Sequence, residues 1–100
     1  MTCTAPCSAN CSYTRTAASL AKQVGMDQFY VDAAAGNLSS VSWLDPSYFD
    51  IPGLLQEATD EHPDHDVTAG ERLLKRVYEA LRASPLWNST ALVVMYDEHG

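Results

Sequence analysis

The most regular alternation of apolar and polar positions lies at residues 66–83 and predicts an α-helix. Its apolar residues recur every three or four positions, which places them on one helix face, and they are Leu73, Leu74, Val77, Tyr78 and Leu81. Two start signals compete. Thr68 and Glu71 form the pattern of a capping box, whereas Asp66 is a rival N-cap. The Ser84–Pro85 step predicts the end of the helix, because a residue before proline avoids the helical conformation.

A continuous apolar run at residues 91–96 predicts a β-strand. The run is apolar on both faces, as in a central parallel strand that is covered on both sides. Val41 and Trp43 alternate with Ser42 and predict another strand, which stops at the Asp45–Pro46 step. The order of strand, loop, helix and strand predicts the α/β fold class, with parallel strands and a long helix in a right-handed crossover.

The other predicted elements are shorter. Residues 1–14 are expected to be irregular, and residues 17–24 predict a short helix that Gly25 would stop. Asp27 is expected to cap a second short helix that ends at Gly36. One face of this helix carries Phe29, Tyr30, Ala33 and Ala34. Residues 46–66 contain three prolines and a glycine, and therefore predict mostly loop.

Composition and charge narrow the function classes. The chain has 100 residues, of which 46% are hydrophobic, and its net charge is −7. Such a length suits one small domain, and an acidic chain gains nothing from releasing the counterions of nucleic acids. We therefore expect no nucleic-acid partner. No apolar run approaches the ~20 residues of a transmembrane helix, and residues 1–20 show no secretory leader. The sequence leaves the localisation unknown.

The three cysteines, Cys3, Cys7 and Cys11, all fall within the first eleven residues. Pro6 disfavours a helix there, and the zinc interpretation lacks a fourth ligand nearby. We interpret them as a local disulfide or as inert thiols, so their role and the redox compartment stay open.

Charge follows the predicted 91–96 strand directly, as Asp97, Glu98 and His99, with Gly100 after them. In open parallel sheets, ligands bind just beyond the carboxyl ends of the strands. Two adjacent carboxylates repel each other unless a cation neutralises them, and their oxygens favour Ca²⁺, Mg²⁺ or Mn²⁺. The residues predict a divalent metal site at Asp97 and Glu98; the alternative is a solvated loop that merely starts a turn.

A second polar cluster, residues 60–66, precedes the long predicted helix and reads DEHPDHD. His62 and His65 are three positions apart among four carboxylates, so they could bind metal or steady a phosphate oxygen. The alternative is that both are exposed, and we favour it for His65 and for Asp64. Asp45, at the end of the other predicted strand, could also belong to a site, although turn formation before Pro46 is its plainer role.

These segments resemble a known family. Residues 62–100, HPDHDVTAGERLLKRVYEALRASPLWNSTALVVMYDEHG, are similar to the phosphoesterase family that contains phosphatidylcholine-hydrolysing and plant non-specific phospholipases C and bacterial acid phosphatases. Residues 45–49, DPSYF, resemble its strand-end segment. Residues 26–44 match more loosely, and we find no convincing match in residues 1–25. We therefore divide the chain into an irregular N-terminal segment, residues 1–25, and a partial phosphoesterase domain, residues 26–100.

The resemblance implies an alkaline-phosphatase-like αβα sandwich that hydrolyses phosphate esters, with a phospholipid or another phosphate ester as substrate. By the family's motifs, Asp97 and Glu98 fall at the metal and phosphate site, and His62 falls at the catalytic His-Pro position, in contact with the phosphate or the leaving group. The resemblance also allows peripheral contact between the full-length enzyme and a membrane.

The chain departs from the family in what it lacks. The family's early Glu-Asn metal motif and its Thr-x-Pro-Asn nucleophile segment are absent. Phosphoryl transfer needs a positioned nucleophile together with the cation, so we expect a fragment of a larger hydrolase that is inactive by itself. The alternative is a non-enzymatic acidic domain that binds Ca²⁺ or a protein partner.

Overall fold

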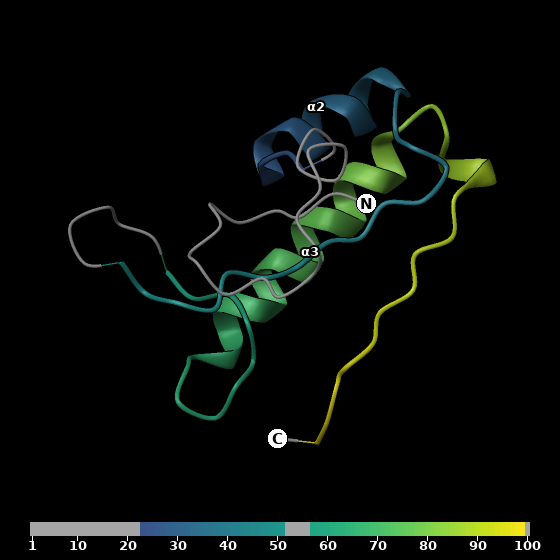
Figure 1. Cartoon of the computed structure of the whole chain (residues 1–100). Coiled ribbons are helices and arrows are strands. Elements are labelled where there is room, and N and C mark those ends of the chain that lie inside the picture. The colour runs from purple at the N-terminus through teal and green to yellow at the C-terminus, as the bar shows by residue number, and fades with distance from the viewer. Residues whose placement is uncertain (1–22, 52–56, 100) are drawn as a thin grey trace.

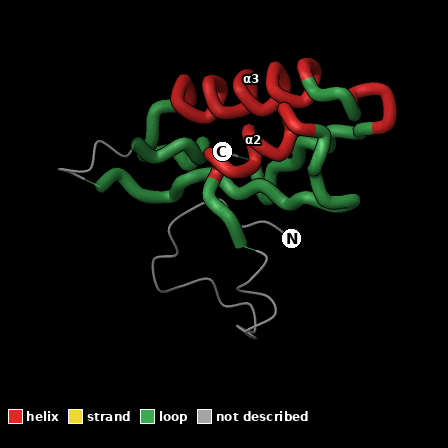
Figure 2. Tube along the Cα trace, turned by 90° about the horizontal axis from the view of Figure 1, so that it is seen from above, coloured by secondary structure: helices red, strands yellow, loops and turns green. Residues whose placement is uncertain are grey.

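The structure is a computed structural model, and it describes residues 23–51 and 57–99. Its elements are α2 (Met26–Ala35), α3 (Val67–Ala83) and the short 3₁₀ helix η1 (Trp87–Ser89). The two α-helices pack against each other, and loop segments run beneath them as a second layer (Figure 2). The cysteines and most of the predicted helix at residues 17–24 lie outside the described residues, while residues 23–25 are not helical.

Helix α3 confirms the prediction from hydrophobic spacing. Asp66 is its N-cap, and the Asp66 carboxylate accepts a hydrogen bond from the backbone N–H of Thr68 at 2.9 Å. The structure therefore selects Asp66 over the capping box of Thr68 and Glu71. The helix ends at Ala83, directly before the Ser84–Pro85 step, as expected.

Helix α2 is present where the sequence predicts it, but two details are wrong. Gly25 is the N-cap without a side-chain hydrogen bond, and Asp27 lies within the first turn, where its negative charge still suits the helix dipole. Ala34 is exposed, whereas Phe29 and Ala33, four positions apart, are buried. Gly36 ends the helix at φ 73°, a conformation that side chains with a Cβ rarely adopt.

The core lies between the two helices. Phe29 of α2 and Val77 and Leu81 of α3 form its buried centre. Partly buried apolar residues surround this centre: Met26, Tyr30, Leu38, Leu44, Leu73 and Leu92. Leu38 and Leu44 flank the loop at residues 39–43, and Leu92 follows η1. Through these residues, the loop at 39–43 and the segment after η1 both pack against the same core.

Residues 90–99 run back along α3 toward its N-terminal end (Figure 1). They are extended, but the structure assigns no β-ladder to residues 91–96, nor to residues 41–44. A strand is defined by pairing with a neighbour, and no such neighbour occurs in the described part of the chain. The α/β sandwich therefore stays a prediction. Because residues 90–99 run in this direction, Asp97 lies near the N-terminal end of α3, where the loop that contains His62 leads into the helix.

Candidate active site

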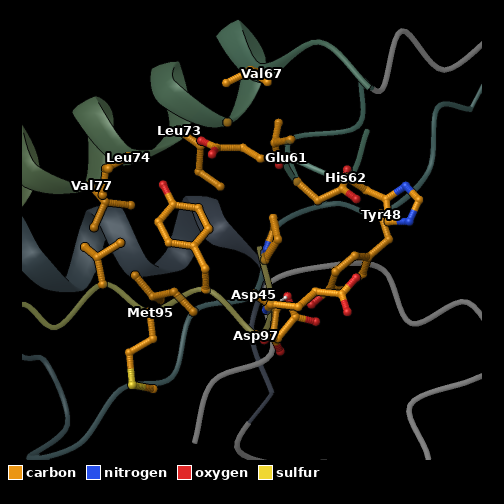
Figure 3. A pocket seen from close by; sticks show the side chains of 18 of the residues that line it. Asp45, Tyr48, Glu61, His62, Val67, Leu73, Leu74, Val77, Met95 and Asp97 are labelled. Atoms are coloured by element: carbon orange, nitrogen blue, oxygen red, sulfur yellow. Dashed lines mark hydrogen bonds between the residues drawn. The ribbon is translucent and has the colours of Figure 1, made fainter. Parts of the chain in front are cut away.

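An open groove of about 920 Å³ lies along α3 and brings the predicted site residues together. Its walls come from α3, from the extended residues 92–99, and from the segments around Asp45 and His62. Figure 3 shows Leu73, Leu74 and Val77 along α3 at one end, and Asp45, His62 and Asp97 toward the other. The groove is thus apolar at one end and charged at the other.

His62 lines this groove with an exposed side chain, at the start of a tight turn. The backbone N–H of His65 donates to the His62 carbonyl at 2.8 Å, which closes the turn. Pro63 occupies the second position of this turn, where its fixed φ is favourable. Directly after it, Asp66 caps α3, and the backbone hydrogen bond from Thr68 lowers the pKa of Asp66 below its ordinary value of 3.8.

His65 does not have the exposed, solvated role that the sequence analysis favours. Its Nδ1 atom lies 2.5 Å from Oδ1 of Asp60, and 23% of the His65 side chain and 12% of the Asp60 side chain are exposed. The sequence placed both residues in one polar cluster, but a spacing of five positions in a loop gives no signal that they pair.

Asp97 and Glu98 also line the groove, and both are exposed. The backbone N–H of Glu98 donates to Oδ1 of Asp97 at 3.0 Å, and the chain bends at these two residues. In the part of the chain that the structure describes, no three His, Cys, Asp or Glu side chains gather closely enough to hold a metal ion. These residues alone therefore do not complete the predicted metal site.

Glu61 and Tyr96 form a link between the two halves of the site that sequence reasoning missed. Glu61 precedes His62 and Tyr96 precedes Asp97. Hydrogen bonding to the Glu61 carboxylate, together with its negative charge, raises the pKa of Tyr96 above the ordinary tyrosine value. The Glu61 side chain lies over Gly70 of α3, where a Cβ atom would be 2.5 Å from the Glu61 Cγ. A glycine inside a predicted helix was the available signal.

Asp45 lines the groove as well, in agreement with the suggestion that it belongs to a site. Its Oδ1 atom accepts a hydrogen bond from the indole N–H of Trp43 at 2.8 Å. Two residues on, the carbonyl of Ser47 accepts from the backbone N–H groups of Thr59 and Asp60, at 2.8 and 3.2 Å. These bonds hold the Asp45 segment beside the loop that carries His62.

Comparison with known proteins identifies the family. A model of the phosphoesterase family matches residues 5–100. The chain belongs to the phosphoesterase family. It is 56% identical over 73 residues to non-specific phospholipase C6 of Arabidopsis thaliana, a match that covers 73% of this chain and 14% of that protein. Its identity to non-specific phospholipase C3 of the same plant is 40% over 95 residues, with 91% of this chain and 18% of that protein covered.

Similarity extends to bacteria. Phospholipase C A of Mycobacterium tuberculosis is 37% identical over 73 residues, which is 72% of this chain and 12% of that protein. No solved structure is significantly similar to the chain. The resemblance drawn from the sequence is thus confirmed, and relatives of this phosphoesterase chain are named as phospholipases C, which are hydrolases. The chain spans less than a fifth of the length of these relatives.

The family match also corrects one statement of the sequence analysis. It begins at residue 5, so the similarity includes most of residues 1–25, where no convincing resemblance was found. That segment contains neither the His-Pro motif nor the Asp-Glu-His-Gly motif that carried the resemblance in residues 62–100. No helix in the described part of this phosphoesterase chain is long and apolar enough to span a membrane.

Proposed function

We propose that this chain contributes the His62 and Asp97–Glu98 segments to the active site of a phospholipase C-like phosphoesterase that hydrolyses a phospholipid. The observation that carries the proposal is the groove, which collects all three side chains from two distant segments of a chain in this family. Its volume is within the range of small-molecule sites.

The polarity of the groove supports a phospholipid as substrate. Apolar side chains of α3 (Leu73, Leu74 and Val77) line one end, and Asp45, His62 and Asp97 lie toward the other (Figure 3). A phospholipid has the same division between its acyl chains and its phosphate headgroup. We infer that the phosphate and the glycerol oxygen attached to it lie at His62 and that the acyl chains extend along α3.

The charge of the groove supports a divalent cation. Five carboxylate residues line it, and its described lining contains no Lys or Arg: the five are Asp45, Asp60, Glu61, Asp97 and Glu98. A phosphate anion would be repelled by such a surface, so we propose that a Ca²⁺, Mg²⁺ or Mn²⁺ ion is held by Asp97 and Glu98 together with ligands outside the described residues. When bound, the cation would supply positive charge for the phosphate oxygens.

In this proposal His62 acts on the leaving group. In hydrolysis an oxygen nucleophile, supplied from outside the described residues, forms a new bond to phosphorus while the bond to the diacylglycerol oxygen breaks, and that oxygen must receive a proton as it leaves. An imidazole is suited to donate it near neutral pH. His62 is exposed to the groove and stands on a closed turn, so its side chain can reach a bound phosphate ester.

The test is a chimera of non-specific phospholipase C6 in which this chain replaces the matching segment. We expect the chimera to hydrolyse phosphatidylcholine vesicles and a chromogenic phosphodiester in the presence of a divalent cation. An inactive but folded chimera would contradict the proposal, and Ca²⁺ binding by the isolated chain without turnover by the chimera would favour the acidic binding domain instead.

A further inference from the structure

We propose that Asp60 and His65 form a positioning pair that holds His62 in the orientation needed for turnover. Asp60 Oδ1 and His65 Nδ1 are 2.5 Å apart, within hydrogen-bond distance. Both side chains are largely shielded from solvent, since 12% and 23% of them are exposed. A hydrogen bond that is shielded from solvent is electrostatically stronger than the same bond in water.

The pair closes the segment that carries His62. Asp60 lies two residues before His62 and His65 lies three residues after it, so their contact joins the two ends of a short loop. Inside this loop the His65 N–H donates to the His62 carbonyl at 2.8 Å. The side-chain contact and the backbone contact therefore restrain the same turn.

The loop is also anchored outside the pair. The backbone N–H of Asp60 donates to the Ser47 carbonyl at 3.2 Å, and Asp66, directly after His65, caps α3. One end of the loop is thus fixed to the Asp45 segment and the other to the helix. A loop that is anchored at both ends loses little freedom when a substrate binds, which favours the proton transfer proposed for the side chain that it carries.

His65 differs from His62 in its surroundings. The groove is lined by His62 and Asp60 but His65 is not among its described lining residues. The two imidazole rings are 6.4 Å apart between centroids and tilted by 59°, and the Nδ1 atom of His65 is occupied by Asp60. His65 therefore acts through Asp60 and the turn, and not on the phosphate.

The first test measures the order of the turn in the 100-residue chain. The variants are Asp60→Asn, His65→Ala and His65→Asn, in which the asparagine amide replaces the Nδ1 donor. The matched control is Asp64→Asn, which makes the same change at an exposed position of the same turn. We expect the ¹H–¹⁵N heteronuclear NOE of the amides at residues 62, 64 and 65 to fall in Asp60→Asn and His65→Ala. It should stay at the wild-type level in Asp64→Asn and recover in part in His65→Asn.

The second test rests on the proposed function and uses the phospholipase C6 chimera. We expect Asp60→Asn and His65→Ala to lower kcat by about 10- to 100-fold, the cost of a small misplacement of a catalytic group, with KM changed less than threefold. His65→Asn should regain part of the loss. If Asp60→Asn and His65→Ala turn over as fast as Asp64→Asn, the inference is overturned. It is also overturned if these two variants lose the order of the turn but keep the wild-type kcat. An inactive parent chimera would contradict the proposed function and not the pair, which the NOE measurement then decides.

Discussion

Three carboxylates in the loop before α3 have three different partners. Asp60 pairs with His65, Glu61 lies over Gly70, and Asp66 caps the helix. They stand within seven positions of one another, and only the cap could be predicted from the sequence, because capping depends on local spacing alone. The other two partners are set by how the loop folds back on itself and on α3.

His62 is the residue in this loop whose loss should affect turnover more than stability. Its side chain is exposed, and it is not one of the residues of the described core. In the chimera, His62→Ala should lower kcat by about 10²- to 10⁴-fold, the usual contribution of a general acid or base, with the melting temperature changed by less than a few degrees. If His62→Ala instead lowers the melting temperature while the folded fraction keeps normal turnover, His62 is structural.

Asp66 should make helix α3 sensitive to acid. Its pKa in the folded chain is lowered, chiefly by the Thr68 backbone hydrogen bond. A lowered pKa means that its stabilising contribution is present above the unfolded value of about 4 and is lost as the pH falls through the folded value. Asp66→Asn keeps an oxygen acceptor at the N-cap but cannot titrate.

The measurement is the helical circular-dichroism signal of the chain between about pH 6 and pH 2. Compared with the wild type, Asp66→Asn should lose less of this signal below about pH 4, whereas the control Asp64→Asn should follow the wild type. Identical acid profiles for Asp66→Asn and wild type would show that the cap carries no pH dependence.

At the scale of elements, α3 organises the molecule. Its apolar face holds α2 and residue Leu92, and its N-terminal half forms one wall of the groove. Periodicity predicts such a helix well, because the pattern that buries it is contained in its own residues. For α2, the position of the helix and its end at Gly36 were also predictable. The predicted apolar face included Ala34, however, and Ala34 is exposed.

Gly70 is the position at which α3 and the His62 loop meet most closely. An alanine would ordinarily stabilise a helix interior by about 1 kcal/mol relative to glycine. Here its Cβ atom would lie 2.5 Å from Glu61 Cγ and 2.7 Å from Glu61 Oε1. The Glu61 side chain would have to move, and its contact with Tyr96 would be broken.

A thermal double-mutant cycle separates these effects. Gly70→Ala should fail to stabilise the wild-type chain, because the gain in helix propensity is offset by the displaced Glu61. In the background of Glu61→Ala, which removes all of the nearest clashing atoms, the same substitution should stabilise by about 1 kcal/mol. Equal effects in both backgrounds would mean that Glu61 does not lie over Gly70.

At the scale of the whole molecule, the β-sheet that the sequence predicts is not seen in the described residues and stays a prediction. Residues 91–96 have the composition of a central strand, yet they form no β-ladder within the described residues, and four of their large side chains are strongly exposed: Val93, Val94, Met95 and Tyr96. A ladder is a property of two segments, so the composition of one of them cannot establish it. The sequence predicts residues 91–96 as a strand that ends at a site, but it gives no sign that residues 92–99 form one wall of a groove along α3.

The isolated 100-residue chain should be of low stability and without turnover. The large residues buried in its described part are few (Phe29, Val77 and Leu81), and several large apolar side chains are exposed. Small cores of this kind rarely provide more than a few kcal/mol. We expect a broad melting curve and no hydrolysis of a chromogenic phosphodiester with Ca²⁺, Mg²⁺ or Mn²⁺. A sharp cooperative transition together with metal-dependent turnover would contradict both expectations.

The central claim is that Asp97 and His62 serve one hydrolytic site, and it is tested most directly by the turnover of the chimera carrying Asp97→Asn. Asp97→Asn keeps the size of the side chain and the oxygen that accepts from the Glu98 N–H, but it removes the charge proposed to hold the cation. We predict that kcat falls by at least about 10²-fold and that more divalent cation is needed for the residual rate. The control Asp64→Asn, exposed and outside the groove lining, should turn over as the unmodified chimera does. Full turnover by Asp97→Asn, with an unchanged requirement for the cation, would contradict the claim.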